Sequence, residues 1–170
     1  LADFDRTLTC GLVNGERTPT IISQLRSCPD YLGEDYVKKT EELFEKYHPI
    51  EINPEIPIKE KQEKMHEWWK KHLGLAIEKD LNKEILKRVV KEKPLEFRKG
   101  FFEFARFLNE NDIPLIIMSA SLGDMIIEYL KKNDLLFPNI FVIGNCYKFD
   151  ENGKAVGVQE PIIHTFNKKE

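Results

Sequence analysis

The chain has 170 residues, of which 41% are hydrophobic and 32% charged, a composition typical of a globular protein with one sizeable core. Its formal net charge of −3 gives no electrostatic reason to bind nucleic acid or an anionic membrane surface. The sequence has no apolar run of membrane-spanning length, and its three cysteines have neither metal-binding nor disulfide spacing. We therefore expect a cytoplasmic protein without a nucleic-acid or membrane partner, and we expect it to be a monomer.

Two carboxylates stand close together in the opening stretch "LADFDRT". If this stretch is a strand, Asp3 and Asp5 point to the same face. Like charges held side by side both ionise only if a cation lies between them or one keeps a proton. The pattern therefore indicates two acids that share a cation or a proton, although a turn containing two aspartates is an alternative. Because so few residues precede Asp3, we also expect the first strand to have lost its beginning.

Three apolar runs predict buried parallel strands, at residues 1–4, 113–120 and 139–145. The segment between the second and third runs has apolar residues at helical spacing and lysines in its last turn. This strand–helix–strand order predicts a right-handed crossover in a parallel sheet. A further helix is expected just before residue 113, and a hairpin around Glu151–Gly153.

The sequence pattern changes between the first and second of these runs. Charge-rich segments there predict helices at Tyr36–Tyr47, Ile58–His72 and Asn82–Lys91. Prolines and polar stretches separate these helices, and no strand-like run is evident among them. We therefore expect an α/β protein in which a helical domain of residues 16–94 is inserted into a core of residues 1–15 and 95–170. The core is expected to be a three-layer, Rossmann-like parallel sheet.

Ligands of such sheets bind beyond the carboxyl ends of the strands. Asp3 and Asp5 are predicted to lie at one such end and Ser119 at another, where the next helix offers free amides to an anion. An equally weighted alternative is that the Ser119 side chain caps the N-terminus of that helix. Two carboxylates facing a serine and free amides predict a site for a metal-bound phosphate.

The order of "DFDRT", the inserted helices, "IIMSA" and the lysines of "HTFNKKE" resembles that of the haloacid dehalogenase superfamily. The strings "YHPIEINP", "EKMHEWWKKHLGL", "FDENGKAVG" and "PIIHTFNKKE" narrow the resemblance to the cytosolic pyrimidine 5′-nucleotidases of type III. That family includes members that accept 7-methylguanosine monophosphate. The resemblance implies a haloacid dehalogenase-like core with a helical cap. It also implies a Mg²⁺-dependent phosphatase whose partner is a small nucleoside monophosphate, namely CMP, UMP or 7-methyl-GMP.

The resemblance also implies a role for each matching residue. Asp3 would form an aspartyl-phosphate, and Asp5 would act as general acid and then as base. Mg²⁺ would bind the Asp3 carboxylate and the Asp5 carbonyl oxygen. Ser119, Ala120 and Lys168 would hold the transferring phosphoryl group. Without the resemblance, Lys168 would be a solvated lysine in a charged tail.

For the base, the resemblance implies that Glu51 accepts hydrogen bonds and that Trp68 stacks on the ring. Their alternatives are an acid on a loop and a tryptophan of the core, and Trp69 is the second candidate for stacking. Lys71 stands where some relatives carry a serine near the base. The histidines at 66, 72 and 164 have no spacing that indicates a metal site.

One motif of the superfamily is missing, because no acidic metal-binding motif follows Lys168. We therefore expect the chain to be truncated at its end as well as at its start. Two alternatives stay open: a phosphatase of another small phosphate ester, or a catalytically dead fragment that binds a nucleotide or a protein partner.

Overall fold

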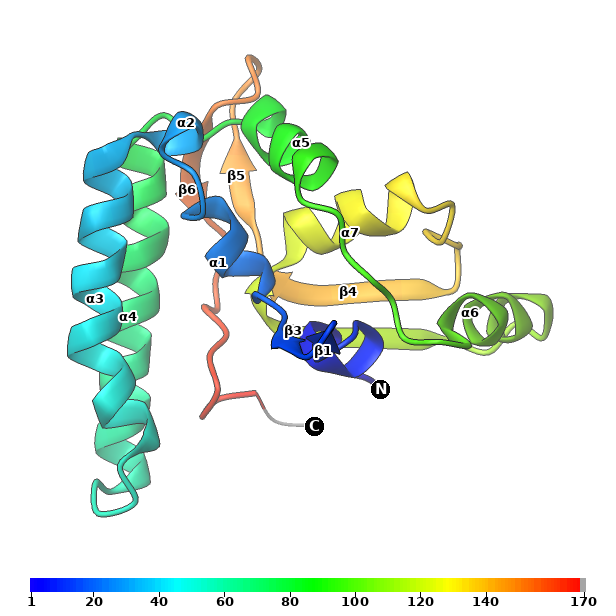
Figure 1. Cartoon of the computed structure of the whole chain (residues 1–170), viewed down its shortest axis with the longest axis horizontal. Helices are drawn as coiled ribbons and strands as arrows, with labels where there is room; N and C mark the ends of the chain where they lie inside the picture. Colours follow the sequence, from blue (N-terminus) through cyan, green and yellow to red (C-terminus); the bar gives the residue numbers. More distant parts are fainter. Residues whose placement is uncertain (169–170) are drawn as a thin grey trace.

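The computed structural model describes residues 1–168, and a parallel strand pair lies at its centre. Strands β3 (Leu115–Leu122) and β4 (Ile140–Asn145) are hydrogen-bonded in parallel, and helix α7 (Gly123–Lys132) connects them (Figure 1). The predicted strand–helix–strand crossover is thus confirmed. Strand β3 ends at Leu122 rather than at residue 120, so the helix begins directly where the strand stops.

The first predicted strand is present only as a single bridge. Ala2 pairs in parallel with Ile117, with its N–H 2.9 Å from the Ile116 carbonyl and its carbonyl 2.8 Å from the Met118 N–H. The position beside β3 agrees with the prediction, but the predicted extension through residue 4 is wrong. The chain turns there into an irregular helical turn, η1 (Phe4–Leu8), whose backbone hydrogen bonds replace those of a strand.

A short hairpin that the sequence analysis missed follows this turn. Strands β1 (Leu12–Val13) and β2 (Glu16–Arg17) are antiparallel, and Asn14 and Gly15 between them have φ values of 52° and 83°. Two consecutive residues with positive φ are typical of a tight hairpin turn, which Asn-Gly favours. Two short helices come next, α1 (Ile21–Leu25) and α2 (Pro29–Leu32).

Two long helices, α3 (Glu34–Ile52) and α4 (Ile58–Glu78), lie side by side at one edge of the molecule (Figure 1). Both are longer than predicted. Pro49 lies inside α3, where it removes only its own backbone donor, and its carbonyl still accepts from the Asn53 N–H at 3.2 Å. Glu51 therefore stands on a helix that extends beyond the predicted end at Tyr47, so the alternative of an acid on a loop is wrong.

The remaining elements pack on both sides of the crossover. Helix α5 (Lys83–Glu92) contacts α7, and the predicted hairpin is confirmed as β5 (Tyr147–Phe149) and β6 (Ala155–Val158), which contacts α4. Since α5 packs on the crossover helix, the expected cap is in contact with the expected core. The division into residues 16–94 and the rest stays a prediction.

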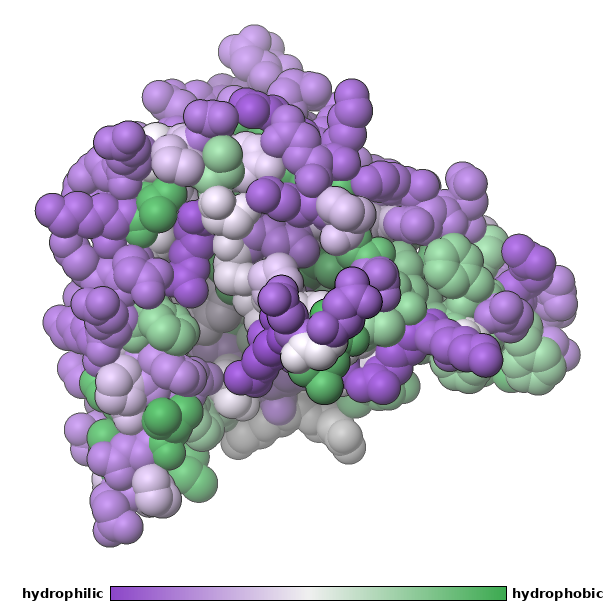
Figure 2. Space-filling view, viewed as in Figure 1, coloured by the Kyte–Doolittle hydropathy of each residue, from purple (hydrophilic) through white to green (hydrophobic). Residues whose placement is uncertain are grey.

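Helix α6 (Phe101–Glu110) exposes part of an aromatic face. Phe101, Ala105 and Leu108 are buried, whereas Phe102 and Phe107 are 40% and 55% exposed. Hydrophobic atoms accordingly gather over α6 in the space-filling view (Figure 2). Among residues 1–168, no helix is both long and apolar enough to cross a membrane.

The tight junction between β3, α7 and β4 gives a first prediction. A Cβ atom on Gly123 would lie 2.6 Å from the Cys146 Sγ atom, whereas a Cβ atom on Gly74 in α4 would meet nothing within 4 Å. We expect Gly123→Ala to lower the free energy of unfolding by about 1–3 kcal/mol. Gly74→Ala should leave it unchanged or raise it by up to about 1 kcal/mol. Urea unfolding followed by circular dichroism measures both, and equal stabilities of the two variants would contradict the described packing.

Candidate active site

A cavity of about 320 Å³ opens where the first bridge and β3 reach their carboxyl ends. It brings together Asp3, Asp5, Ser119, Ala120 and Lys168, as the sequence predicted. Glu51 and Trp68 do not line it. Five further residues complete its wall, namely Thr20, Ile22, Trp69, Ser121 and Thr165.

Lys168 and Asp3 form an ion pair at the centre of this cavity. The Lys168 Nζ atom lies 2.5 Å from Asp3 Oδ1, and the Thr7 hydroxyl lies 3.5 Å from the other carboxylate oxygen. Lys168 is therefore not a lysine extended into solvent. The ammonium group compensates the charge of Asp3 while the Asp3 side chain stays 39% exposed to the cavity.

Asp5 has a different environment. Its Oδ1 atom accepts the Ile21 N–H at 3.0 Å, and the Ser121 side chain lowers the pKa of its carboxyl group. Burial, the largest cause, raises the pKa of Asp5 from 3.8 to about 6; the Ile21 amide lowers it in part, and the charge of Asp3 raises it. Asp5 can thus keep and exchange a proton near neutral pH.

Two arginines hold the turn that carries Asp5. Arg6 has a φ of 63°, and its guanidinium donates to the Thr18 carbonyl at 2.7 Å. The guanidinium of Arg98 donates to the carbonyls of Thr7 and Arg6 at 2.7 and 2.8 Å. A non-glycine residue in the left-handed region costs free energy, and these hydrogen bonds help to offset that cost.

Ser119 and Ser121 point to the same face of β3, because residues two apart on a strand share a face. The Ser119 Oγ atom accepts the Ser121 N–H at 3.1 Å, and the Ser121 Oγ atom accepts the Ile22 N–H at 3.0 Å. Ser119 does not cap α7, since the strand continues to Leu122. The sequence analysis missed Ser121, although its spacing from Ser119 was the available signal.

Asn145 was also missed, and it fixes the segment that carries Lys168. From the end of β4, its side-chain amide donates to the carbonyls of Ala120 and Ile163 and accepts the Ile163 N–H, each at 2.8 Å. The turn of residues 162–168 is thereby attached to the end of the sheet. A polar residue at the carboxyl end of a predicted strand was the signal for it.

Of the two predicted base-binding residues, Glu51 lies near the end of α3 outside the cavity. Its carboxylate accepts the Thr165 hydroxyl at 2.7 Å and lies 3.3 Å from the His48 Nδ1 atom. Trp68 stacks on Tyr47 with ring centroids 5.8 Å apart. Their roles toward a base stay predictions, while Trp69 is the tryptophan that lines the cavity.

A second cavity of about 130 Å³ adjoins the first and shares Thr20, Ile22 and Trp69 with it. Four of its nine lining residues carry an aromatic ring. Burial, with the charge of Arg26, lowers the pKa of His72 to about 4. The His72 ring is therefore neutral at pH 7. The additional lining residues are Ser23, Arg26, Thr40, Phe44, Trp68 and His72.

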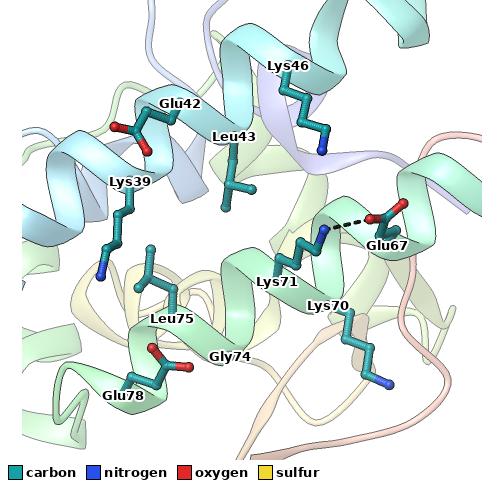
Figure 3. A pocket seen from close by; sticks show the side chains of 10 residues that line it. All are labelled: Lys39, Glu42, Leu43, Lys46, Glu67, Lys70, Lys71, Gly74, Leu75 and Glu78. Carbon is teal, nitrogen blue, oxygen red and sulfur yellow. Dashed lines mark hydrogen bonds and ion pairs between the residues drawn. The ribbon is translucent and has the colours of Figure 1, made fainter.

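A separate hollow lies between the two long helices (Figure 3). It has a volume of about 690 Å³ between α3 and α4, and it shares no lining residue with the cavity of Asp3. Lys71 lies in this hollow, where it pairs with Glu67 at 2.5 Å and donates to the Tyr47 hydroxyl at 3.0 Å. The hollow is lined largely by charged side chains, which suit contact with solvent, and we assign it no catalytic role.

The donors near Asp3 suit one class of metal ion. Within residues 1–168, no three side chains of His, Cys, Asp or Glu gather into a metal cluster. The Asp3 carboxylate and the Asp5 carbonyl are hard oxygen donors. Mg²⁺ typically binds one or two carboxylates together with waters and phosphate oxygens. The donor set therefore fits Mg²⁺ and not a thiolate- or imidazole-bound metal.

Comparisons with known proteins identify the family of this chain. The family model of pyrimidine 5′-nucleotidase (UMPH-1) matches residues 6–170. The chain belongs to the pyrimidine 5′-nucleotidase (UMPH-1) family. The resemblance described above is thereby confirmed.

Family relatives match the whole chain but are longer than it. The 7-methylguanosine phosphate-specific 5′-nucleotidase A of Xenopus laevis is 38% identical over 168 residues, 99% of this chain and 58% of the relative. The relative from Mus musculus is 37% identical over 99% of this chain and 56% of its own length. The chain thus spans little more than half the length of these curated relatives.

Solved structures show the same fold. Cytosolic 5′-nucleotidase IIIB bound to cytidine superposes with a TM-score of 0.84 at 32% identity, covering 97% of this chain and 55% of that one. An analogue of the phosphoaspartyl intermediate of phosphoserine phosphatase has a TM-score of 0.51 at 18% identity, which shows the fold alone. The predicted haloacid dehalogenase-like α/β fold with a helical insertion is confirmed.

The raised pKa of Asp5 gives a second prediction. Between its unfolded value of 3.8 and its folded value of about 6, the folded state keeps a proton that the unfolded state has lost. Stability from this group is therefore present at low pH and lost as the pH rises through 6. In Asp5→Asn this loss is absent, so the variant should gain up to about 3 kcal/mol relative to wild type between pH 4 and 7.

The free energies of unfolding of both proteins, measured in EDTA across this pH range, give that difference. A difference that does not change with pH would contradict the described burial of Asp5.

Proposed function

We propose that the protein is a Mg²⁺-dependent phosphatase of nucleoside 5′-monophosphates. The observation that carries this proposal is the meeting of Asp3, Asp5, Ser119 and Lys168 in one cavity of a chain from a pyrimidine nucleotidase family. A phosphate ester needs a nucleophile, a proton donor and cationic groups around its oxygens. These four residues supply all three.

In the first step, an Asp3 carboxylate oxygen attacks phosphorus. An Asp3 oxygen–phosphorus bond forms, and the bond from phosphorus to the nucleoside 5′ oxygen breaks. Asp5 supplies the leaving oxygen with a proton, for which its pKa of about 6 is well placed. The products are a nucleoside and an aspartyl-phosphate on Asp3.

In the second step, water attacks the phosphorus of the aspartyl-phosphate. Asp5, now ionised, takes a proton from that water, the Asp3 oxygen–phosphorus bond breaks, and phosphate leaves. The same group thus serves as acid and then as base, which a pKa near the working pH allows.

Three groups hold the phosphoryl oxygens. The Lys168 ammonium group already contacts Asp3. The Ser119 oxygen accepts the Ser121 N–H, and this bond leaves the hydroxyl proton of Ser119 to donate to a phosphoryl oxygen. The Ala120 backbone lies between the two serines on the cavity wall. The Asp3 carboxylate and the Asp5 carbonyl would hold Mg²⁺, which supplies further positive charge to the transferring group.

The second cavity is our candidate for the base. Its aromatic wall suits a flat ring, and it adjoins the phosphate cavity through Trp69. Trp68 belongs to that wall, and Glu51 is the proposed acceptor for an amino group of the base. CMP, UMP and 7-methyl-GMP are the proposed substrates, which agrees with the names of the relatives. We further propose a cytoplasmic monomer.

The alternatives differ at specific points. An inactive nucleotide-binding fragment would have no need of an Asp3–Lys168 pair beside an acid with a raised pKa. A phosphatase of another small ester would have no need of the adjoining aromatic cavity. Both observations favour the nucleotidase.

A third prediction separates the roles of the two acids in the full-length protein. Asp3→Asn should abolish hydrolysis of CMP and of p-nitrophenyl phosphate, because an amide does not form the aspartyl-phosphate. Asp5→Asn should lower kcat for CMP by about 10²–10⁴-fold.

With p-nitrophenyl phosphate, whose leaving group needs no proton, Asp5→Asn should release a burst of about one p-nitrophenol per enzyme before slow turnover. Stopped-flow absorbance measures that burst. If the burst is absent and p-nitrophenol is released at the slow rate from the start, Asp5 does not act as the general acid.

A fourth prediction concerns the base. Glu51→Gln removes the charge but keeps an oxygen that accepts from Thr165. If Glu51 accepts from the base, kcat/KM for CMP should fall about tenfold more than kcat/KM for p-nitrophenyl phosphate, which has no base. Steady-state kinetics with both substrates give this ratio. Equal losses on the two substrates would make Glu51 a residue that does not read the base.

A further inference from the structure

The turn of residues 162–168 is held by the two long helices as well as by the sheet. From α3, the Glu51 carboxylate accepts the Thr165 hydroxyl at 2.7 Å. From α4, the Gln62 side-chain amide donates to the Phe166 carbonyl at 2.9 Å. Two helices of the expected cap therefore bind the segment that ends at Lys168.

A lysine strengthens this attachment. The Lys61 Nζ atom of α4 donates to the Glu51 carbonyl at 3.0 Å and lies 5.3 Å from the centre of the Phe166 ring. It joins the end of α3, the start of α4 and the turn. Since Lys61 is buried, its ammonium group depends on these contacts.

The turn itself is internally bonded. The N–H groups of Asn167 and Lys168 donate to the His164 carbonyl at 3.1 and 3.2 Å, and the Asn167 side chain accepts the His164 N–H at 2.7 Å. These bonds span Thr165, so a displacement of Thr165 is transmitted to Lys168. The contact between Lys168 and Asp3 lies at the other end of the same unit.

We propose that Thr165 is a positioning residue: by donating its hydroxyl to Glu51, it ties α3 to the 162–168 turn and so keeps Lys168 on Asp3. This inference rests on the proposed function and deepens it. The carboxylate proposed to meet the base is the same one that holds the turn. The position of the end of α3 and the placement of Lys168 are thereby coupled through one hydrogen bond.

The coupling has a chemical consequence for substrates without a base. A carboxylate has several lone pairs, so Glu51 can accept from Thr165 and from a base together. Because the hydrogen bond from Thr165 to Glu51 does not depend on a base, loss of the Thr165 hydroxyl should impair the phosphoryl step even when the substrate has no base. A residue that only filled space at the cavity rim would not have this effect.

The test uses the full-length protein with p-nitrophenyl phosphate and four variants: Thr165→Val, Thr165→Ser, Glu51→Ala and the double variant Glu51→Ala/Thr165→Val. Thr165 is exposed, so its substitutions should not disturb folding. Thr165→Val should lower kcat about fivefold with KM within about twofold, and Thr165→Ser should restore kcat. The double variant should be no slower than the slower single variant, because each single substitution already removes the same hydrogen bond between Thr165 and Glu51.

Hydrogen exchange gives a readout that does not depend on turnover. Amides of residues 162–168 should exchange faster in Thr165→Val and Glu51→Ala than in wild type, and Thr165→Ser should match wild type. Gln62→Ala, which frees the Phe166 carbonyl, should raise exchange in the same segment.

An unchanged kcat and unchanged exchange in Thr165→Val, or losses that multiply in the double variant, would overturn the inference. A wild-type protein without phosphatase activity would refute the proposed function instead, and the exchange experiment would still decide whether Thr165 holds the turn.

Discussion

Two carboxylates two residues apart cannot both be charged and buried without compensation, and the structure around Asp3 and Asp5 meets this constraint in two ways. Asp3 faces the cavity and is paired with Lys168. Asp5 is half-buried, accepts an amide of α1 and has a pKa raised to about 6. The same separation supports the proposal that Asp3 is the nucleophile and Asp5 the general acid. The two neighbouring acids are thereby proposed to have different chemical roles.

This solution requires segments from distant parts of the chain. Lys168 is brought to Asp3 by a turn that Asn145 attaches to the end of β4 and that Glu51 attaches to α3. Asp5 in turn depends on Ser121 of β3 and on the first amides of α1. The long helices are therefore more than a cover beside the sheet. Their ends take part in holding the group that compensates the nucleophile.

The sequence predicted the parts of the site whose signals are local. Apolar runs predicted β3 and β4, helical spacing predicted α7, and the pattern of the first residues predicted the paired acids. The placement of Lys168 came only from the resemblance, because a lysine in a charged tail has no local signal. Ser121 was missed although its spacing from Ser119 is a sequence signal, and the continuation of α3 through Pro49 was missed because proline usually ends a helix. The hairpin at Asn14 was missed because its strands are only two residues long.

The central claim is that the two acids have different roles and that Asp3 alone takes the phosphoryl group. It is tested most directly by mixing the full-length protein with CMP that carries a labelled phosphate, quenching in acid during turnover and mapping the labelled peptide. The account predicts label on the peptide that contains Asp3, at the Asp3 side chain, and none on Asp5. Label on Asp5, or steady turnover of CMP with no labelled protein at any time, would contradict it.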